Sequence, residues 1–375
     1  MIDVYYNYII VVALIVILLY AFFNIGVIIG WLRLPLTKIE KQNTKYLKFS
    51  ILIPIRNEEN HILDILRDIE NQIYDKHSYE IIVIDDSSQD KSYQLVKQLY
   101  IKNLTLIKSR GEGKKEALKT GLDIAKNSFI IQTDADCKIG SNWLAGINQY
   151  LNKNSVKLLI APVVFRSQNT FFSSLQELDF YGLMMNTAGL AGLNHPIMAN
   201  GANLIYPKEL VSDYNHRQVK SSSGDDIFLL HYIKKKFGNK DIHFLKSKEA
   251  TIETAPNSSL KEFVYQRLRW ASKSKYYNDL DTIGAGIIIF TTYFSLLILL
   301  YFSFWSEDLK HVFLYLFIFK LIIDTLTLLP ILKFYKKWNL IIYFPILAFV
   351  YPFYVSFVGI ISLFVSFKWK GRLYS

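Results

Sequence analysis

Apolar residues are distributed unevenly along this chain of 375 residues. One uninterrupted apolar run covers residues 9–32, and three further apolar blocks cover residues 283–304, 312–332 and 340–367. A helix rises ~1.5 Å per residue and the hydrocarbon core of a bilayer is ~30 Å thick, so each block is long enough to cross a membrane. The pattern predicts four membrane segments, one before and three after a more polar central part.

The first apolar run has two interpretations. A cleaved signal peptide would carry a basic residue before the run and a small-residue cleavage site after it, and neither is present. The run is also longer than the apolar core of a signal peptide. We therefore expect an uncleaved transmembrane anchor over residues 1–33.

The central part begins with short β-rich runs that alternate with helical ones. Strands are predicted at residues 49–55, 80–84, 104–107 and 129–132. Three helices are expected between them, marked by Asn57-Glu58-Glu59 with Ile62, Leu66, Ile69 and Ile73, by the cap Asp90 with Val96 and Leu99, and by Ala117 with Leu122. This alternation predicts an α/β fold with a parallel sheet covered by helices.

Two helical stretches follow further along. Residues 170–193 are mostly apolar, and residues 260–277 mix aromatic with basic side chains, as in a helix that lies at a membrane surface.

Charge gives the chain a direction in the membrane. All Lys and Arg residues follow Leu32, and most of them lie between Arg33 and Lys275, so the positive-inside rule predicts a cytoplasmic central part. A simple fourth crossing would then place the basic tail at residues 368–372 outside. Breaks at Pro345 and Pro352 would keep that tail inside, and the sequence leaves this block undecided.

The net charge of +11 and the single cysteine exclude several classes of protein. The basic residues are scattered and crowd the membrane-proximal ends, which suits anionic lipid headgroups and a nucleotide diphosphate better than nucleic acid. Cys137 is the only cysteine, so an intrachain disulfide and a cysteine zinc site are excluded.

Two acidic motifs directly follow predicted strands. Ligands of open α/β sheets bind beyond the carboxyl ends of strands, which is where Asp85-Asp86 and Asp134-Ala135-Asp136 lie. Two carboxylates in an Asp-x-Asp suit a hard cation, Mg²⁺ or Mn²⁺, that bridges phosphate oxygens. Asp85-Asp86 suits hydrogen bonds from a base or a ribose. A bare Asp-x-Asp is more often a solvated turn, but the shared strand-end position favours ligand binding.

Two other motifs contain a glycine beside charged residues. Gly224-Asp225-Asp226 follows a polar loop over residues 221–223; Asp225 is expected to cap the next helix, which leaves Asp226 as a candidate general base. The loop-to-helix junction at Gly113-Lys114-Lys115 is suited to facing phosphate, although it lacks the Walker pattern.

The segment Gln266-Arg267-Leu268-Arg269-Trp270 is basic and aromatic. Helical spacing places Gln266, Arg269 and Trp270 on one face, where a guanidinium can bind a diphosphate and an indole can support a sugar ring. The alternative is an interfacial helix that contacts lipid phosphate and the aromatic belt. The upstream carboxylates favour the first interpretation.

In combination these motifs resemble glycosyltransferase family 2 over about residues 49–270. The resemblance is to its membrane-embedded branch, which includes cellulose, chitin, hyaluronan and poly-N-acetylglucosamine synthases and ceramide glucosyltransferases. In chain order it is carried by Ser50-Ile51-Leu52-Ile53-Pro54-Ile55-Arg56-Asn57-Glu58-Glu59, Asp85-Asp86, Gly113-Lys114, Asp134-Ala135-Asp136, Gly201-Ala202-Asn203, Gly224-Asp225-Asp226 and Gln-x-x-Arg-Trp.

The resemblance implies a Rossmann-like GT-A domain over residues 48–255, an interfacial helix within 256–282 and a membrane region over 283–375. It implies inverting transfer from a UDP-sugar with Mg²⁺ or Mn²⁺. Asp226 would be the catalytic base, and Asp134 and Asp136 would hold the metal. The implied binding residues are Asp85, Asp86, Pro54, Arg56, Glu58 and Lys114 for the nucleotide, and Gln266, Arg269, Trp270, Gly201, Asn203 and Asp225 for the diphosphate and the acceptor.

The expected protein is an integral enzyme of the inner or plasma membrane with a cytoplasmic catalytic domain and a lipid-linked or saccharide acceptor. One alternative is a processive β-polysaccharide synthase, alone or with an accessory membrane subunit, although such synthases generally carry more membrane spans. Another is an inactive nucleotide-sugar-binding scaffold. Lys320 and Asp324 are expected to neutralise each other along one helix rather than to line an acceptor path.

Overall fold

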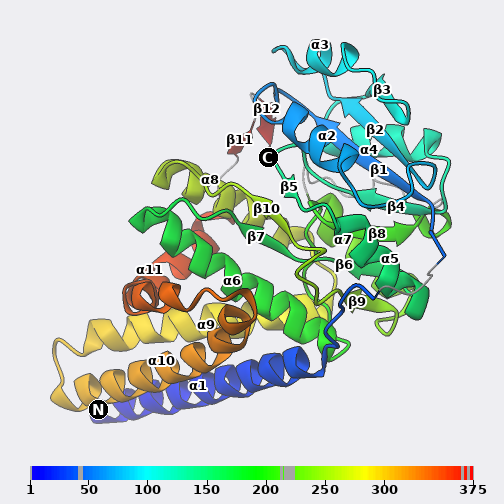
Figure 1. Cartoon of the computed structure of the whole chain (residues 1–375). Coiled ribbons are helices and arrows are strands. Elements are labelled where there is room, and N and C mark those ends of the chain that lie inside the picture. Colours follow the sequence, from blue (N-terminus) through cyan, green and yellow to red (C-terminus); the bar gives the residue numbers. More distant parts are fainter. Residues whose placement is uncertain are drawn as a thin grey trace.

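The structure is a computed structural model that describes residues 2–40, 45–211, 214, 224–364, 367–369 and 372–374. Sheets and short helices make up one part, and long helices make up the other (Figure 1). The N-terminus lies at the end of the helical part that is far from the sheets, and β11 (Phe367–Trp369) lies against α8 (Leu260–Ala271).

A seven-stranded sheet forms the centre of the first part, in the order β3-β2-β1-β4-β8-β6-β9. The pairs among β1, β2, β3 and β4 are parallel, as predicted, whereas β8 runs antiparallel to β4 and β6, so the sheet is mixed. The strands are β1 Phe49–Ile55, β2 Tyr79–Asp85, β3 Leu104–Lys108, β4 Phe129–Gln132, β6 Leu158–Ile160, β8 Leu204–Pro207 and β9 Ile242–Phe244.

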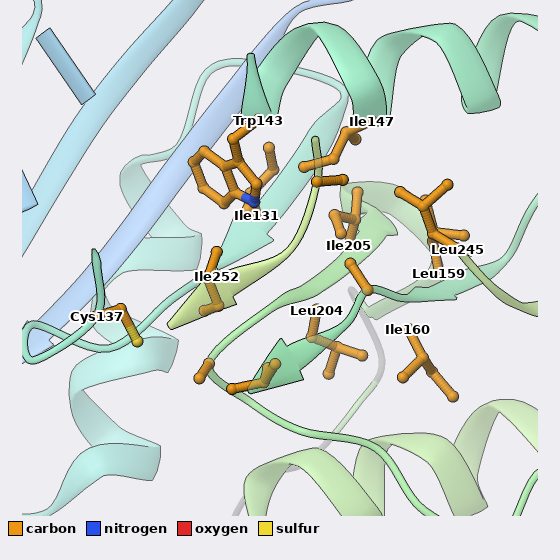
Figure 2. Close-up of a cluster of buried hydrophobic side chains, with 14 of the residues drawn as sticks. Ile131, Cys137, Trp143, Ile147, Leu159, Ile160, Leu204, Ile205, Leu245 and Ile252 are labelled. Carbon is orange, nitrogen blue, oxygen red and sulfur yellow. The ribbon is translucent and has the colours of Figure 1, made fainter. Parts of the chain in front are cut away.

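A smaller sheet of β5 (Lys138–Ile139), β10 (Ile252–Thr254) and β7 (Val163–Phe165) packs beside the first. The hydrophobic core between the two sheets surrounds Trp143, the first residue of α5 (Trp143–Lys153). The Trp143 side chain is fully buried. Figure 2 shows Ile131 of β4, Ile205 of β8 and Ile252 of β10 around this indole. The two sheets therefore share one hydrophobic core.

The first two of the three helices between the first strands are shorter than predicted. They are α2 (Ile62–Glu70), α3 (Ser92–Lys97) and α4 (Lys114–Ile124). Ile73 lies beyond α2 and is 66% exposed, so its assignment to the apolar face was wrong. Residue 91, not Asp90, is the N-cap of α3, but the Asp90 carboxylate still accepts the Ser92 N–H at 3.0 Å.

Helix α6 (Phe171–Gly192) joins the two parts of the molecule. It begins with a capping box between Thr170 and Ser173 and packs against β7 and β9 on one side and α1 and α10 on the other. Its crossing with α1 (Ile2–Arg33) is so close that a Cβ on Gly30 would lie 1.7 Å from the Gly189 carbonyl oxygen. Helix α6 therefore holds the sheets against the long apolar helices.

Four helices correspond to the four predicted membrane segments in length and composition. The helices long and apolar enough to span a membrane are α1, α9 (Leu280–Phe302), α10 (Glu307–Tyr335) and the segment Trp338–Ile361. The last segment consists of the short helix η3 (Trp338–Tyr343) and α11 (Phe344–Ile361). Large apolar side chains such as Leu18, Phe22 and Ile322 are exposed on these helices, as expected for surfaces that meet lipid.

The last apolar block contains the prolines of both predicted breaks. Pro345 stands in the first turn of α11 and Pro352 lies inside it, so neither proline ends the helix. The Tyr343 ring just before α11 lies 5.8 Å from Phe171 at the start of α6. Strand β11 (Phe367–Trp369), which pairs with β12 (Arg372–Tyr374), lies against α8 (Leu260–Ala271). The segments on either side of α11 therefore contact α6 and α8.

Lys320 and Asp324 form the expected ion pair along α10, with 2.8 Å between Nζ and Oδ2. The Tyr20 hydroxyl of α1 donates to the Asp324 carboxylate at 2.7 Å and lies 3.3 Å from the Tyr293 hydroxyl of α9. Hydrogen bonds between membrane helices fix their packing. This buried group therefore ties α1, α9 and α10 together.

Candidate active site

A cavity of about 1200 Å³ begins at the carboxyl ends of β1, β2 and β4 and continues between α1, α6, α8, α9, α10 and α11. It exceeds the ~300–1000 Å³ of most ligand sites. The predicted site residues that line it are Pro54, Arg56, Glu58, Asp86, Lys114, Asp134, Asp136, Gly201, Asp225, Asp226, Gln266, Arg269 and Trp270. Asp85 and Asn203 do not line it.

Asp86 stands at the end of β2, facing the first turn of α4. Its carboxylate accepts the Gly113 N–H at 2.9 Å, and Arg56 Nη1 donates to its carbonyl oxygen at 2.9 Å. Gly113 has φ 94°, which favours glycine at this turn. The preceding Asp85 is buried and accepts the Ser88 N–H at 3.3 Å, so it supports the loop behind Asp86.

The Asp-x-Asp motif lies beyond β4, with Asp134 Oδ1 2.5 Å from Lys114 Nζ. Asp136 Oδ2 accepts the Thr254 hydroxyl at 3.2 Å. Burial lowers the pKa of Lys114, but the charges of Asp134 and Asp225 outweigh it and hold that pKa above its usual value. The ammonium therefore stays charged beside the carboxylate.

The described residues contain no group of three or more His, Cys, Asp or Glu side chains that could hold a metal ion. Asp134 and Asp136 do offer two carboxylates on the cavity wall. Mg²⁺ commonly uses one or two protein carboxylates and completes its shell with phosphate oxygens and water. The residues present fit such a shared site.

Gly224 and the two aspartates after it begin α7 (Asp225–Phe237). The expected cap by Asp225 is wrong, because the N-cap residue is Gly224 at φ 92° and Asp225 Oδ2 instead accepts Gln132 Nε2 at 2.5 Å. A Cβ on Gly201 would lie 2.8 Å from that Gln132 nitrogen, so a larger residue there would displace the amide that contacts Asp225. The loop over residues 221–223 lies outside the described residues.

Asp226 is held by two backbone groups and one cation. Its Oδ1 accepts the Ile227 N–H at 2.8 Å, its Oδ2 accepts the Gly201 N–H at 3.2 Å, and Lys273 Nζ lies 3.9 Å from Oδ1. Burial lowers the pKa of Lys273, and the nearby Asp226 opposes that effect. The carboxylate therefore faces the cavity in a fixed orientation.

Lys273 lines the cavity, and the motif analysis missed it. It lies in the short helix η2 (Ser272–Tyr276) that continues α8, four residues after Arg269. Positions four apart share one face of a helix. Extending the periodicity of the Gln-x-x-Arg-Trp motif by one turn would have found it.

Gln266, Arg269 and Trp270 lie on the cavity side of α8, as their spacing predicted. Gln266 Oε1 accepts Asn257 Nδ2 at 3.0 Å. The intervening Arg267 is buried and pairs with Asp179 of α6. The motif helix therefore contacts both the cavity and the membrane-facing helices.

Asn203 is fully buried in the core below the cavity. Its Oδ1 accepts the Trp143 indole N–H at 3.0 Å, and its Nδ2 donates to the carbonyl oxygens of Pro162 and Ala250 at 2.9 Å each. These bonds occupy both the oxygen and the nitrogen of the Asn203 side chain. Asn203 therefore anchors the loop that carries Gly201 and makes no contact with the cavity.

Known proteins resemble the chain in sequence and in fold. Residues 50–213 match the family model described as Glycosyl transferase family 2. The dolichyl N-acetyl-alpha-D-glucosaminyl phosphate 3-beta-D-2,3-diacetamido-2,3-dideoxy-beta-D-glucuronosyltransferase of Methanococcus voltae is 25% identical over 358 residues, which cover 85% of this chain and 99% of that protein. Glycosyltransferase AglE of Haloferax volcanii is 25% identical over 181 residues, 48% of this chain and 58% of AglE.

The mannosyltransferase PcManGT of Pyrobaculum calidifontis, solved with GDP-Man and Mn²⁺, is similar in structure with a TM-score of 0.58. The superposition covers 94% of this chain and 99% of that chain at 17% sequence identity, so the likeness concerns the fold. That fold is the GT-A α/β fold, as expected, with a mixed sheet in place of the predicted parallel one. Residues 50–213 therefore match a glycosyltransferase family 2 domain, and the chain is a glycosyltransferase.

Proposed function

We propose that this glycosyltransferase moves a sugar from a nucleoside-diphosphate sugar to a hydroxyl of a lipid-linked acceptor at the membrane surface. The observation that carries the proposal is the continuity of the cavity, which has the strand-end carboxylates at one end and four apolar helices at the other. A soluble acceptor would require no apolar arm. A polar donor and an amphipathic acceptor would each match one end.

The donor occupies the polar end. Asp86, supported by Asp85, accepts hydrogen bonds from the nucleoside, a uridine in our proposal. Pro54, Arg56, Glu58 and Lys114 surround the nucleotide. Basic Lys114, Arg269 and Lys273 balance the charge of the diphosphate, since charge-assisted hydrogen bonds to phosphate are the stronger ones.

Asp134 and Asp136 would hold Mg²⁺ or Mn²⁺ on the diphosphate. When bound, the cation neutralises charge that develops on the leaving group. Lys114, which pairs with Asp134, is placed to help neutralise that negative charge.

Transfer is a single inverting displacement. The acceptor hydroxyl gives its proton to the Asp226 carboxylate, its oxygen bonds to the anomeric carbon, and the bond from that carbon to the diphosphate oxygen breaks with release of the nucleoside diphosphate. Asp225 and Gly201 hold the base in place through the Gln132 and backbone contacts. Gln266 and Trp270 bind the acceptor sugar from α8.

The acceptor lipid occupies the apolar arm between the membrane helices. The membrane region would consist of residues 1–33 and 283–375 and lie in the inner or plasma membrane. The catalytic domain at 48–255 would face the cytoplasm, and residues 256–282 would form an interfacial segment. The Methanococcus voltae relative is named for a dolichyl-phosphate-linked sugar acceptor, which supports an acceptor of this class.

A donor screen tests the proposal. Purified protein with Mn²⁺ or Mg²⁺ is incubated with UDP-Glc, UDP-GlcNAc, UDP-Gal, UDP-GlcA or GDP-Man, and release of the nucleoside diphosphate is measured. We expect one UDP-sugar to give acceptor-stimulated release. Nucleotide binding without release for every donor would contradict the proposal and favour the inactive nucleotide-sugar-binding scaffold.

A processive β-polysaccharide synthase is the second candidate. It is favoured by one observation: polar Tyr20, Asn24 and Asp324 line the inner part of the cavity between apolar helices. Product length separates the two functions, because single transfer adds one sugar per acceptor and a synthase yields long chains. A partner subunit would be required only by the second.

A further inference from the structure

Arg267 is the residue of the α8 motif whose role the proposed function leaves unexplained. It lies between Gln266 and Arg269 but is 4% exposed and turned toward α6. Its Nη2 donates to Asp179 Oδ2, and the other oxygen of Asp179 accepts the Tyr351 hydroxyl of α11. One carboxylate thus joins α8, α6 and α11.

Two aromatic rings hold the guanidinium of Arg267. Its Cζ lies 4.4 Å from the centre of the Trp270 ring and 4.8 Å from that of Phe263. Arginine stacks on aromatic faces because its planar cation is weakly hydrated. The Trp270 ring also lies 6.5 Å from Phe180 of α6, so the indole is confined between Arg267 and α6.

The Arg267–Asp179 pair is a poor source of stability by itself. Nε and Nη1 of Arg267 are buried and have no hydrogen-bond partner among the described residues. Such unmade bonds cost free energy, and an apolar pair of similar volume often stabilises a core as well. Such a buried arginine is better explained by a need to orient its neighbours than by a need to stabilise the fold.

The position of Arg267 shows what it orients. Asp179, Arg267, Tyr351 and Trp270 all line the cavity where its polar end meets the membrane helices. The proposed acceptor sugar lies at this junction, with its lipid in the arm beyond. A displaced indole would misplace the acceptor and leave the donor site at β1, β2 and β4 unchanged.

We propose that Arg267 is a positioning residue that fixes the indole of Trp270, and with it α8, against α6 and α11 for acceptor binding. This inference rests on the proposed function. It assigns Arg267 a task in acceptor use and none in donor binding.

The test compares Arg267→Lys with wild-type protein. Lysine keeps the charge beside Asp179 and loses the planar stack, so we expect the fold and the donor Kd to stay within two-fold. We expect the KM for a phytanyl-phosphate-linked N-acetylglucosamine probe to rise about tenfold, ~1.4 kcal/mol, and kcat to change less. Lys261→Met, an exposed change on α8, is the matched control.

A double-mutant cycle with Trp270→Ala tests whether Arg267 acts through the indole of Trp270. If Arg267 acts through the indole, Arg267→Lys adds little to the KM of Trp270→Ala protein, because the two effects are not additive. If the Arg267→Lys variant unfolds, the neutral double variant Arg267→Met with Asp179→Asn replaces it in the test. It removes both charges together and keeps an oxygen that can accept the Tyr351 hydroxyl.

A readout on the indole itself needs no acceptor. Acrylamide quenching of Trp270, taken as the difference from Trp270→Phe protein, should increase in Arg267→Lys. Unchanged quenching, or equal changes in donor Kd and acceptor KM, would overturn the positioning role. Loss of donor binding by the wild-type protein would instead refute the proposed function.

Discussion

The two ends of the cavity are built differently. The donor end consists of short segments directly after β1, β2 and β4 and the start of α7, and its charged groups are held by named partners, as Asp226 is by Gly201 and Lys273. The inner end gathers single side chains from α1, α6, α9, α10 and α11. In the proposed function, the chemistry is therefore local in sequence, whereas acceptor recognition depends on how distant helices pack. Substitutions at the two ends should separate donor use from acceptor use.

The largest effect is expected at the donor end from Asp226→Asn. The amide cannot take the acceptor proton, so transfer should fall by about 10²–10⁴-fold while the nucleotide Kd stays the same. Turnover by nucleotide release and binding by calorimetry measure the two quantities. Asp123→Asn, at an exposed pair with Arg110, is the control. Wild-type turnover in Asp226→Asn would exclude this residue as the base.

At the inner end, Lys320→Met should act on stability. It leaves Asp324 without its ion-pair partner, and breaking a buried pair costs about 3–5 kcal/mol. The double variant Lys320→Met with Asp324→Leu should recover most of this loss and retain transfer. Thermal unfolding in detergent compares the three proteins. Loss of transfer by a well-folded double variant would show that the pair contacts the acceptor.

Gly286→Phe tests whether the apolar arm holds the acceptor. Gly286 lines the cavity and an added Cβ would meet no atom within 4 Å, so there is room for a ring at the wall of the arm. We expect the acceptor KM to rise about tenfold, ~1.4 kcal/mol, with donor Kd unchanged. Gly284→Phe is a matched control, because Gly284 has the same free space on α9 and does not line the cavity. Equal effects of both changes would contradict acceptor binding in this arm.

Asp136→Ala should weaken the metal dependence of donor binding. One of two carboxylates is lost, so we expect about tenfold weaker nucleotide binding in Mn²⁺ and little change in EDTA. Calorimetry in both buffers gives the difference. A variant that binds equally well in Mn²⁺ would exclude Asp136 as a metal ligand.

The smallest effect concerns pH. Burial lowers the pKa of Lys273, so its ammonium loses its proton at a lower pH than a free lysine, whose pKa is about 10.4. The charge beside Asp226 is then present below that lowered pKa and lost above it. Lys273→Arg stays protonated and should move the alkaline limb of kcat/KM to higher pH. An unchanged alkaline limb would show that a group other than Lys273 titrates there.

The sequence predicted the donor end well because its residues follow strands with clear patterns. The bounds of β1 and β4 and the strand-end positions of Asp86, Asp134 and Asp136 agree with the structure. Asp225 was misjudged as a cap, since the contact of Gln132 with it joins residues far apart in the chain.

The inner end was mostly beyond prediction. Asp179 and Tyr351 belong to helices whose apolar composition indicates only membrane or core, and nothing local shows that they meet at Arg267. The mixed sheet has a similar cause, because the antiparallel pairing of β8 is set by tertiary contacts. Short-range patterns identify elements and motifs, whereas helix packing decides which side chains share a cavity.

The most direct measurement follows the transferred sugar. Wild-type protein in nanodiscs is incubated with a radiolabelled UDP-sugar selected by the donor screen, Mn²⁺ and the phytanyl-phosphate-linked N-acetylglucosamine probe, and the products are extracted and sized. The account predicts label in the organic phase on a product one sugar larger than the probe, absent with Asp226→Asn. Label found only in free sugar or in long polymer would contradict it.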